Sequence, residues 1–412
     1  MSEKIADAYE KPQTSFEKSH TLYGKPQTSF EVGHIGVLDG IRAIAILIVM
    51  WFHFWQQSWL SPEAGPLNLD WLPRTGYLMV DMMIFLSGFC LFLPYARAMV
   101  YGEKTQSVSE FYVKRAARIL PSYYAAIAIA LIFALAMGVY VDNKALFGDL
   151  VPHVFFVHNF FPAACVDTKL NGVLWTVAVE MQLYLFFPLY ARAFQKKPMI
   201  TYIVMALLGL FSSYYIGQNM ETLNPALYSN HVLTFTSVYT NGLLAAWLYV
   251  AMTKGRKRNC AEGIFWTIAA VVCVYVYFLL TKDLREAASG AQWQVENRYI
   301  LSLVFMLFVI AVIFSSGWFR RIFDNRIMAF LSGISYNLYI WHQFIAVKFK
   351  EFRIPYWEGD VEPNQLGDTI WQWKYMIGCL ALTFLVATVM TYLVERPLAK
   401  KILALYGRHR VK

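Results

Sequence analysis

Charged residues are scarce in this chain of 412 residues, of which Asp, Glu, Lys and Arg make up only 15%. A soluble domain usually carries about 25% charged residues, so an ordinary soluble fold is excluded. Hydrophobic residues make up 58%, and they fall in long runs rather than in amphipathic stripes. Runs of about 18 to 22 apolar residues cross a hydrocarbon core of about 30 Å as a helix. The composition therefore predicts an all-α, polytopic integral membrane protein.

Other features are also missing. No pair among the five cysteines suggests a disulfide framework or a metal site. No cleavable signal peptide is visible, because the first apolar run starts near Ile35, after a polar tail, and is long enough to span. The formal charge of +9 does not indicate a nucleic-acid partner, since Lys and Arg sit in short loops beside the apolar runs. The cysteines are Cys90, Cys165, Cys260, Cys273 and Cys379.

About ten membrane spans are expected, with no separate soluble domain left over. If the N-terminus is inside, the cytoplasmic segments hold 25 of the 36 Lys and Arg residues. This asymmetry places both termini in the cytosol and the chain in the cytoplasmic membrane. The expected spans are 36–57, 77–98, 120–141, 174–195, 198–217, 232–252, 263–281, 299–315, 328–348 and 373–394.

Three regions are expected along the chain. Residues 1–35 form a flexible cytosolic tail in which KPQTSFE occurs twice, shifted by 14 residues, at 11–17 and 25–31. This repeat is either a local duplication in a polar tail or a docking element. Residues 36–397 form the membrane domain, and 398–412 form a short basic cytosolic tail.

Ionisable side chains inside the spans indicate a functional site, because each costs several kcal/mol unless it is paired or faces a cavity. Arg42 and His53 lie on one face of the first span, about 16 Å apart along its axis. Arg42 has the alternative of extending to the inner headgroups. His53 has the alternative of a core histidine that bonds a neighbouring helix.

Three further ionisable residues, Asp81, Glu180 and His342, lie in other spans. The helical rise from the expected boundaries places them at about the level of His53. Together they predict a buried polar site in the outer half, where a carboxylate orients an imidazole as general base. Asp81 has the alternative of a helix N-terminal cap, and His342 that of a structural hydrogen bond.

Arg115 and Arg118 form a second cluster, near the cytoplasmic side. They are three residues apart and share one helical face, a fork suited to phosphate oxygens. The alternative is a simple topological signal that contacts lipid headgroups.

Six segments in order resemble the acyltransferase 3 family of bacterial membrane O-acyltransferases. Single motifs are moderately specific, and the ordered set, which runs from about Leu38 to Pro397, is strong. The segments are LDGIRAIAILIVMWFHF, VDMMIFLSGFCLF, FYVKRAARILPSYY, LWTVAVEMQLYLFFPL, ISYNLYIWH and the terminal ERP.

The resemblance implies roles for particular residues. The family's Arg and His of the first span match Arg42 and His53, and its Arg-x-x-Arg motif matches Arg115 and Arg118. Its Trp-rich segment ending in Glu matches Trp175 and Glu180, but the neighbouring acid is replaced by Met181, which puts proton handling in doubt. Family members often carry an extracellular esterase-like domain, and this chain resembles the stand-alone type.

The resemblance further implies transfer of an acyl group, most often acetyl, from cytosolic acyl-coenzyme A to a hydroxyl of a sugar or related acceptor. Acyl-coenzyme A would be a co-substrate, with no permanently bound cofactor and no metal. The arginines would hold its phosphates, His53 would deprotonate the acceptor, and Glu180 would orient His53, with Asp81, Trp175 and His342 as supporting polar residues. Membrane lipids are the other expected partner, and the oligomeric state is left open. The alternatives are a proton-coupled transporter or flippase and a membrane sensor.

Overall fold

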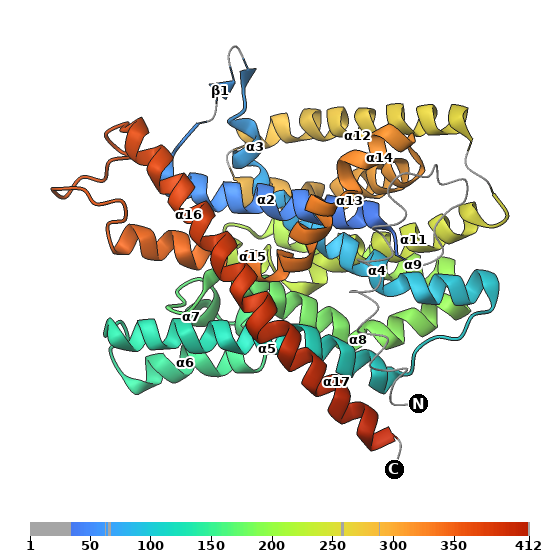
Figure 1. The fold of residues 1–412 in the computed structure, drawn as a ribbon, viewed down its shortest axis with the longest axis horizontal. Coiled ribbons are helices and arrows are strands. Elements are labelled where there is room, and N and C mark those ends of the chain that lie inside the picture. Colours follow the sequence, from blue (N-terminus) through green and yellow to red (C-terminus); the bar gives the residue numbers. More distant parts are fainter. Residues whose placement is uncertain (1–33, 62, 65–66, 257–258, 288, 411–412) are drawn as a thin grey trace.

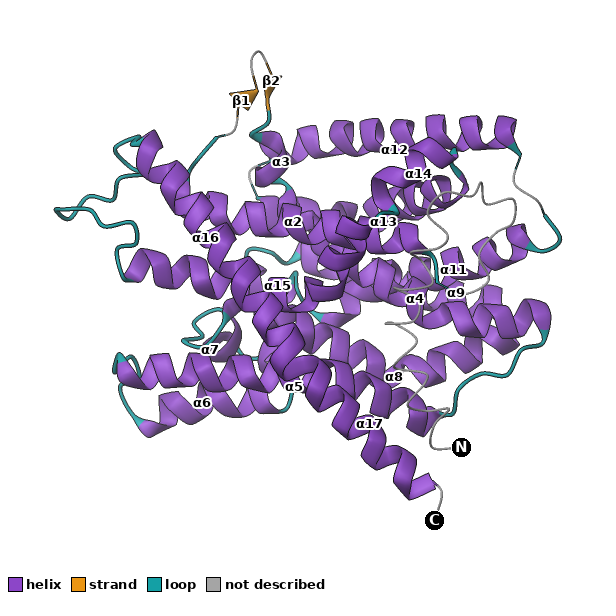
Figure 2. Cartoon of the chain, in the orientation of Figure 1, coloured by secondary structure: helices purple, strands orange, loops and turns teal. Residues whose placement is uncertain are grey.

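The computed structural model describes residues 34–61, 63–64, 67–256, 259–287 and 289–410 of the chain. It is a bundle of helices, many of which run along the long axis of the view (Figure 1). The only strands in the described part are β1 (Glu63–Ala64) and β2 (Leu67–Asn68), a short hairpin that projects from the upper edge of the bundle (Figure 2). The all-α class is confirmed. The repeat predicted in the N-terminal tail lies outside the described residues.

The longer helices, and the short ones between them, have the following bounds. They are α2 (Gly36–Ser58), α3 (Trp71–Arg74), α4 (Met79–Tyr101), α5 (Val108–Ala136), α6 (Asn143–Val154), α7 (Pro162–Cys165), α8 (Trp175–Lys196), α9 (Pro198–Gln218), α10 (Pro225–Tyr228), α11 (Thr236–Thr253), α12 (Cys260–Glu286), α13 (Gly290–Phe314), α14 (Gly317–Phe323), α15 (Arg326–Glu351), α16 (Thr369–Val389), the π-helical turn η5 (Met390–Glu395) and α17 (Arg396–Arg410).

Eight helical segments in the described ranges are long and apolar enough to cross a membrane. They correspond to eight of the ten predicted spans, so the chain is a multi-pass membrane protein. The segments are Gly36–Ser58, Gly76–Tyr101, Val108–Ala136, Gly172–Lys196, Pro198–Gln218, Cys260–Arg285, Gly290–Phe314 and Thr369–Arg408.

The other two predicted spans, 232–252 and 328–348, are helical as α11 and α15 but are not among these eight. Both carry buried polar side chains, Asn241 in α11 and Asn337 in α15 among them. Both are also among the helices most extensively packed by protein, α11 against α4 and α15 against α2. Because protein surrounds them, polar groups bonded to neighbouring helices replace part of the apolar surface that lipid would require.

The third span begins earlier than predicted. The sequence placed it at 120–141, whereas α5 starts at Val108. The side chain of Ser107 caps the helix by accepting a hydrogen bond from the backbone N–H of Glu110 at 3.3 Å. This Ser-x-x-Glu pattern is a helix start signal that lies upstream of the apolar run. Arg115 and Arg118 therefore lie within the helix, about two and about three turns beyond its start.

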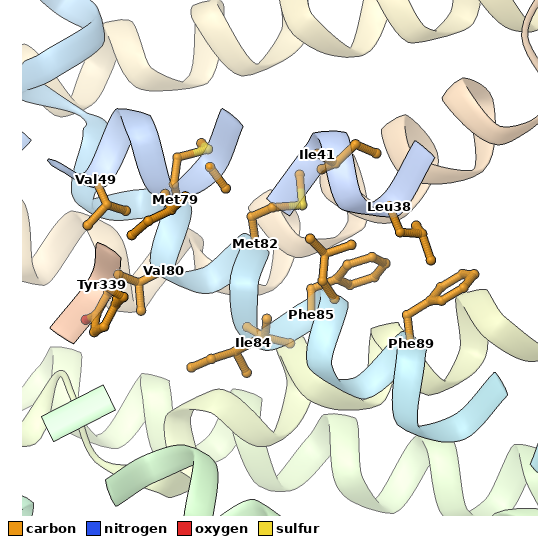
Figure 3. Close-up of a cluster of buried hydrophobic side chains, with 14 of the residues drawn as sticks. Leu38, Ile41, Val49, Met79, Val80, Met82, Ile84, Phe85, Phe89 and Tyr339 are labelled. Carbon is orange, nitrogen blue, oxygen red and sulfur yellow. The ribbon is translucent and has the colours of Figure 1, made fainter. Parts of the chain in front are cut away.

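The centre of the bundle is apolar side chains from α2 and α4, which meet Tyr339 of α15 (Figure 3). Two glycines bring α4 and α11 into close contact. A Cβ atom on Gly88 would lie 2.5 Å from the carbonyl oxygen of Tyr239, and one on Gly242 would lie 2.3 Å from that of Phe85. Small residues at such crossings let helix backbones approach within a membrane.

We expect Gly242→Ala to destabilise the protein by roughly 1–3 kcal/mol, since the added methyl group meets backbone that cannot move aside. The thermal midpoint in detergent measures this. Gly148→Ala is the matched control, because a Cβ on Gly148 has nothing within 4 Å and alanine favours the helix. An equal midpoint for Gly242→Ala and wild type would contradict the close crossing.

The C-terminal residues continue the last span rather than leaving the bundle. The helix α17 covers most of the segment that was predicted as a short basic tail, and it packs against α5. Near its end, the hydroxyl of Tyr406 lies 2.8 Å from the Ser109 hydroxyl, in the first turn of α5.

The segment between α5 and α8 is folded and contains two stacked imidazoles. The rings of His153 and His158 are 3.9 Å apart and nearly parallel. Burial lowers the pKa of both, that of His158 well below its ordinary value. Nearby, buried Asp149 accepts hydrogen bonds from Tyr140 and Thr168, each at 2.8 Å. A packed segment of this kind can fix where the following helix begins.

Candidate active site

His53 and His342 form a histidine pair, with ring centroids 5.0 Å apart. The Nδ1 of His53 lies 2.9 Å from the Gln56 Oε1 and 3.2 Å from the Gln343 Nε2. The Gln56 Oε1 can only accept, so it bonds the tautomer of His53 that is protonated on Nδ1. The Gln343 Nε2 can only donate, so it bonds the tautomer with a lone pair on Nδ1. With Nδ1 protonated and donating to Gln56, the Nε2 lone pair can accept a proton.

His342 is fully buried, and its tautomer follows from its own helix. Its Nδ1 lies 2.6 Å from the carbonyl oxygen of Tyr339 and 3.1 Å from that of Leu338, so Nδ1 carries the hydrogen. This is the structural hydrogen bond that one of the two interpretations predicted. The Nε2 lone pair has no hydrogen-bond partner within the described part of the chain. The pair therefore combines one oriented imidazole with one buried acceptor.

A second group, the arginine cluster, consists of Arg42, Cys90, Arg115 and Tyr184. Arg42 Nη2 lies 3.5 Å from the Cys90 Sγ, and the Arg115 guanidinium lies 5.9 Å from the centroid of the Tyr184 ring. Arg42 also lies 3.8 Å from the Asp39 carboxylate. The Nε of Arg115 is buried and has no hydrogen-bond partner among the residues that are described. These two guanidinium groups can bind a further anion.

Arg118 has a different partner from Arg115. Its Nη1 lies 3.9 Å from the carboxylate of Glu395, which is buried in η5 and accepts a hydrogen bond from Asn337 at 2.7 Å. That the two arginines form a single fork toward phosphate oxygens stays a prediction, since within the described residues Arg118 contacts a carboxylate and the Nε of Arg115 has no hydrogen-bond partner. Arg118 is already partly neutralised by a carboxylate of the chain.

Glu180 belongs with the arginine cluster and not with the histidine pair. Its Oε1 accepts hydrogen bonds from the hydroxyls of Ser87, at 3.0 Å, and of Tyr184. Ser87 is six residues beyond Asp81 on α4, which is about 9 Å along a helix. Within the described ranges, the side chains that bond His53 are Gln56 and Gln343. That Glu180 orients His53 stays a prediction that no contact supports.

The difference in level has a physical reason. The turn η3 (Gly172–Leu174), which precedes α8, packs against α15 inside the bundle. Asn171 donates to the carbonyl oxygen of Ile340 at 2.8 Å, and a Cβ on Gly172 would lie 3.1 Å from the Gln343 side chain. Gly172 therefore lies beside the histidine pair. Glu180 follows eight residues later, which places it about 12 Å from the pair along the helix axis.

Asp81 forms a buried ion pair that the sequence did not reveal. Its Oδ2 lies 3.2 Å from the Nε of Arg298, and both side chains are fully buried. The sequence placed Arg298 in an outer loop, whereas it lies within α13 and also donates to the Ser229 carbonyl at 2.7 Å and to the Thr234 hydroxyl at 2.6 Å. The cap interpretation is wrong, since Asp81 bonds another helix. An arginine beside a long apolar run was the available signal.

Trp175 is the first residue of α8, and the ring of Phe235 lies between it and the Asp81–Arg298 ion pair. Its ring centroid lies 6.0 Å from that of Phe235, and the guanidinium carbon of Arg298 lies 4.0 Å from the centroid of the same Phe235 ring. Trp175 is therefore close to the ion pair as well as to the start of α8. Within the described residues, no three His, Cys, Asp or Glu side chains are grouped to hold a metal ion.

Fold and polar groups together define a multi-pass membrane protein with a basic cluster and a histidine pair inside its helix bundle. The chain belongs to the acyltransferase 3 family: the family model described as an acyltransferase domain matches residues 35–393. The resemblance inferred from the ordered motifs is confirmed.

Curated relatives are similar at modest identity. The chain is 22% identical to the peptidoglycan O-acetyltransferase OatA of Listeria monocytogenes serovar 1/2a, over 89% of this chain and 56% of that protein. It is 23% identical to a putative O-acetyltransferase of Staphylococcus aureus (strain COL), over 77% and 51%. It is 25% identical to a putative acetyltransferase of Acidianus two-tailed virus, over 73% and 80%.

The chain spans about half the length of the first two of these relatives. No solved structure matches it.

Proposed function

We propose that this protein is a membrane O-acyltransferase that moves an acyl group, in particular acetyl, from cytosolic acyl-coenzyme A to a hydroxyl of a carbohydrate or related acceptor. The relatives' names support acetyl transfer to oxygen. The observation that carries the proposal is the arrangement on α2. Arg42 lies in the arginine cluster, and His53, whose Nδ1 lies within hydrogen-bond distance of Gln56 and Gln343, lies about 16 Å along the same helix.

The donor enters, in this proposal, from the end of the bundle that holds the arginine cluster. Arg42 and Arg115 bind phosphate oxygens of coenzyme A, and the pantetheine arm extends along the bundle toward His53. Both termini and this end face the cytosol, as the distribution of Lys and Arg predicts. The acceptor then meets the thioester at the level of the histidine pair.

The chemistry needs one base. The Nε2 of His53 takes the proton of the acceptor hydroxyl while its Nδ1–H donates to Gln56. The acceptor oxygen attacks the thioester carbonyl, the carbon–sulfur bond breaks, and an ester forms. The leaving thiolate takes the proton back from the His53 imidazolium, which gives free coenzyme A and restores the base.

The direct test is incubation of protein reconstituted in lipid vesicles with acetyl-coenzyme A labelled in the acetyl group, with and without a hydroxyl-bearing sugar. We expect slow release of free coenzyme A that the acceptor accelerates. Movement of the sugar or of protons across the vesicle membrane, without cleavage of the thioester, would instead establish a transporter.

The two neighbouring arginines should behave differently. Arg115→Ala should raise the apparent KM for acetyl-coenzyme A about tenfold or more with little change in stability, since no side chain of the described chain bonds its Nε. Arg118→Ala should mainly lower the thermal midpoint, because it removes one of the two arginines beside the buried Glu395 carboxylate, the other being Arg396. Steady-state kinetics and thermal melts of the two variants check this, and identical kinetic effects with unchanged midpoints would contradict the split.

A further inference from the structure

Tyr239, on α11, is a fully buried tyrosine whose hydroxyl has no hydrogen-bond partner in the described part of the chain. Buried tyrosine hydroxyls usually find a partner, because an unmade hydrogen bond in a low-dielectric interior costs free energy. The position lies at the tight crossing of α4 and α11, where a Cβ on Gly88 would lie 3.2 Å from the Tyr239 ring. The side chain is therefore fixed in place, with its polar end unsatisfied.

The surroundings of Tyr239 are polar on one side. Its ring lies 6.3 Å from that of Phe187, one turn from Tyr184 on α8. It lies within electrostatic range of Tyr184, Glu180 and Arg115. The Tyr239 hydroxyl is thus grouped with Glu180, Tyr184 and Arg115 and not with the histidine pair.

Two further polar atoms of this group are also unused by the chain. Glu180 receives both of its hydrogen bonds, from Ser87 and Tyr184, on Oε1, which leaves Oε2 as an open acceptor within the described ranges. The buried Nε–H of Arg115 likewise has no hydrogen-bond acceptor within the described ranges. A hydroxyl donor and a carboxylate acceptor together match the C=O and N–H of an amide.

The position of Glu180 along the axis of α4, which Ser87 marks, determines which part of a bound ligand lies beside it. Ser87 is three residues from Cys90, which contacts Arg42, so Glu180 lies about 5 Å from the arginine cluster along the axis. It lies about 12 Å from the histidine pair. A ligand with phosphates at Arg42 and a thioester at His53 passes this point nearer its phosphate end. In coenzyme A the arm carries two amides, and the one farther from sulfur is the nearer to the phosphates.

We propose that Tyr239 and Glu180 bind that amide of the pantetheine arm, with the Tyr239 hydroxyl donating to its carbonyl oxygen and Glu180 Oε2 accepting from its N–H. This inference rests on the proposed function and identifies the donor as a pantetheine thioester. A donor with a plain hydrocarbon chain at this level would leave the Tyr239 hydroxyl and the Glu180 Oε2 without these partners.

The test compares Tyr239→Phe with wild type on two small acetyl donors. S-acetylpantetheine carries both amides, and S-acetyl-N-acetylcysteamine carries only the one beside sulfur. We expect Tyr239→Phe to lower kcat/KM about tenfold for S-acetylpantetheine and for acetyl-coenzyme A. For S-acetyl-N-acetylcysteamine, kcat/KM should stay within about twofold of wild type. The thermal midpoint should equal or exceed that of wild type, since the lost hydroxyl bonds no described residue.

Tyr375→Phe is the matched control, because Tyr375 is equally buried but its hydroxyl donates to the Ala346 carbonyl at 2.6 Å. It should lower the midpoint and leave the ratio between the two donors unchanged. An equal loss on both donors in Tyr239→Phe, or no loss on either, overturns the amide assignment while wild-type turnover upholds the proposed function. A wild type that neither binds coenzyme A by titration calorimetry nor turns over any donor overturns both.

Discussion

Replacing His53 by alanine is expected to lower acetyl transfer at least about a hundredfold, because a positioned general base contributes roughly 10²–10⁴ to the rate. The same change should leave the apparent KM for acetyl-coenzyme A close to wild type, since the phosphates bind about 16 Å away at the arginine cluster. Release of labelled coenzyme A from vesicle-reconstituted protein measures both parameters.

The control for this variant is His231→Asn. His231 precedes η4 (Val232–Phe235), and its Nδ1 accepts the backbone N–H of Leu233, a role that asparagine can fill. It should retain wild-type turnover. If His53→Ala kept more than about a tenth of the wild-type rate, His53 would not be the base.

The largest effect on stability is expected from Arg298→Met, at roughly 3–5 kcal/mol. The substitution leaves the Asp81 carboxylate fully buried without its cation, and the Ser229 carbonyl and Thr234 hydroxyl lose a donor. The thermal midpoint and the yield of folded protein in detergent measure the loss.

The double variant Asp81→Leu with Arg298→Met should recover much of that loss, since it removes both buried charges together. The exposed pair of Arg256 and Glu262 is the control: Arg256→Ala should cost no more than about 1 kcal/mol. If Arg298→Met and Arg256→Ala melted alike, the buried pair would not contribute as its geometry indicates.

Most of the fold could be predicted because hydropathy reports the apolar surface that lipid requires. Eight of the ten predicted spans correspond to helical segments that are long and apolar enough to cross a membrane. The predicted start of the third span was wrong because α5 begins after a polar cap, Ser107, which lies upstream of the apolar run. In α11 and α15, apolar runs identified helices but could not show that protein rather than lipid surrounds them.

The candidate site was partly predictable for the same kind of reason. Spacing within a single helix placed Arg42 and His53 on one face of α2, and His342 does join His53. Comparing depths between helices placed Glu180 at the level of His53, whereas Glu180 bonds Ser87 and Tyr184, because α8 starts beside Gln343 inside the bundle. Such an offset depends on the packing of the preceding segment, which no local pattern encodes.

Pairings between distant helices were the part that the sequence could not supply. The partner of Asp81, Arg298, is 217 residues away. Tyr239 is one of 26 tyrosines, and nothing in its neighbourhood in the sequence distinguishes a hydroxyl without a partner. Both facts follow only from which side chains the fold brings together.

The contacts of the C-terminal helix have a consequence for how the protein is made. Glu395 pairs with Arg118, and Tyr406 bonds Ser109, so the beginning of α5 is held by residues that are translated much later, in the case of Tyr406 297 residues after its partner. While the ribosome still covers those residues, the helix that carries Arg115 lacks these supports. The end of the bundle that holds the arginine cluster is thus completed only after α17 has been made.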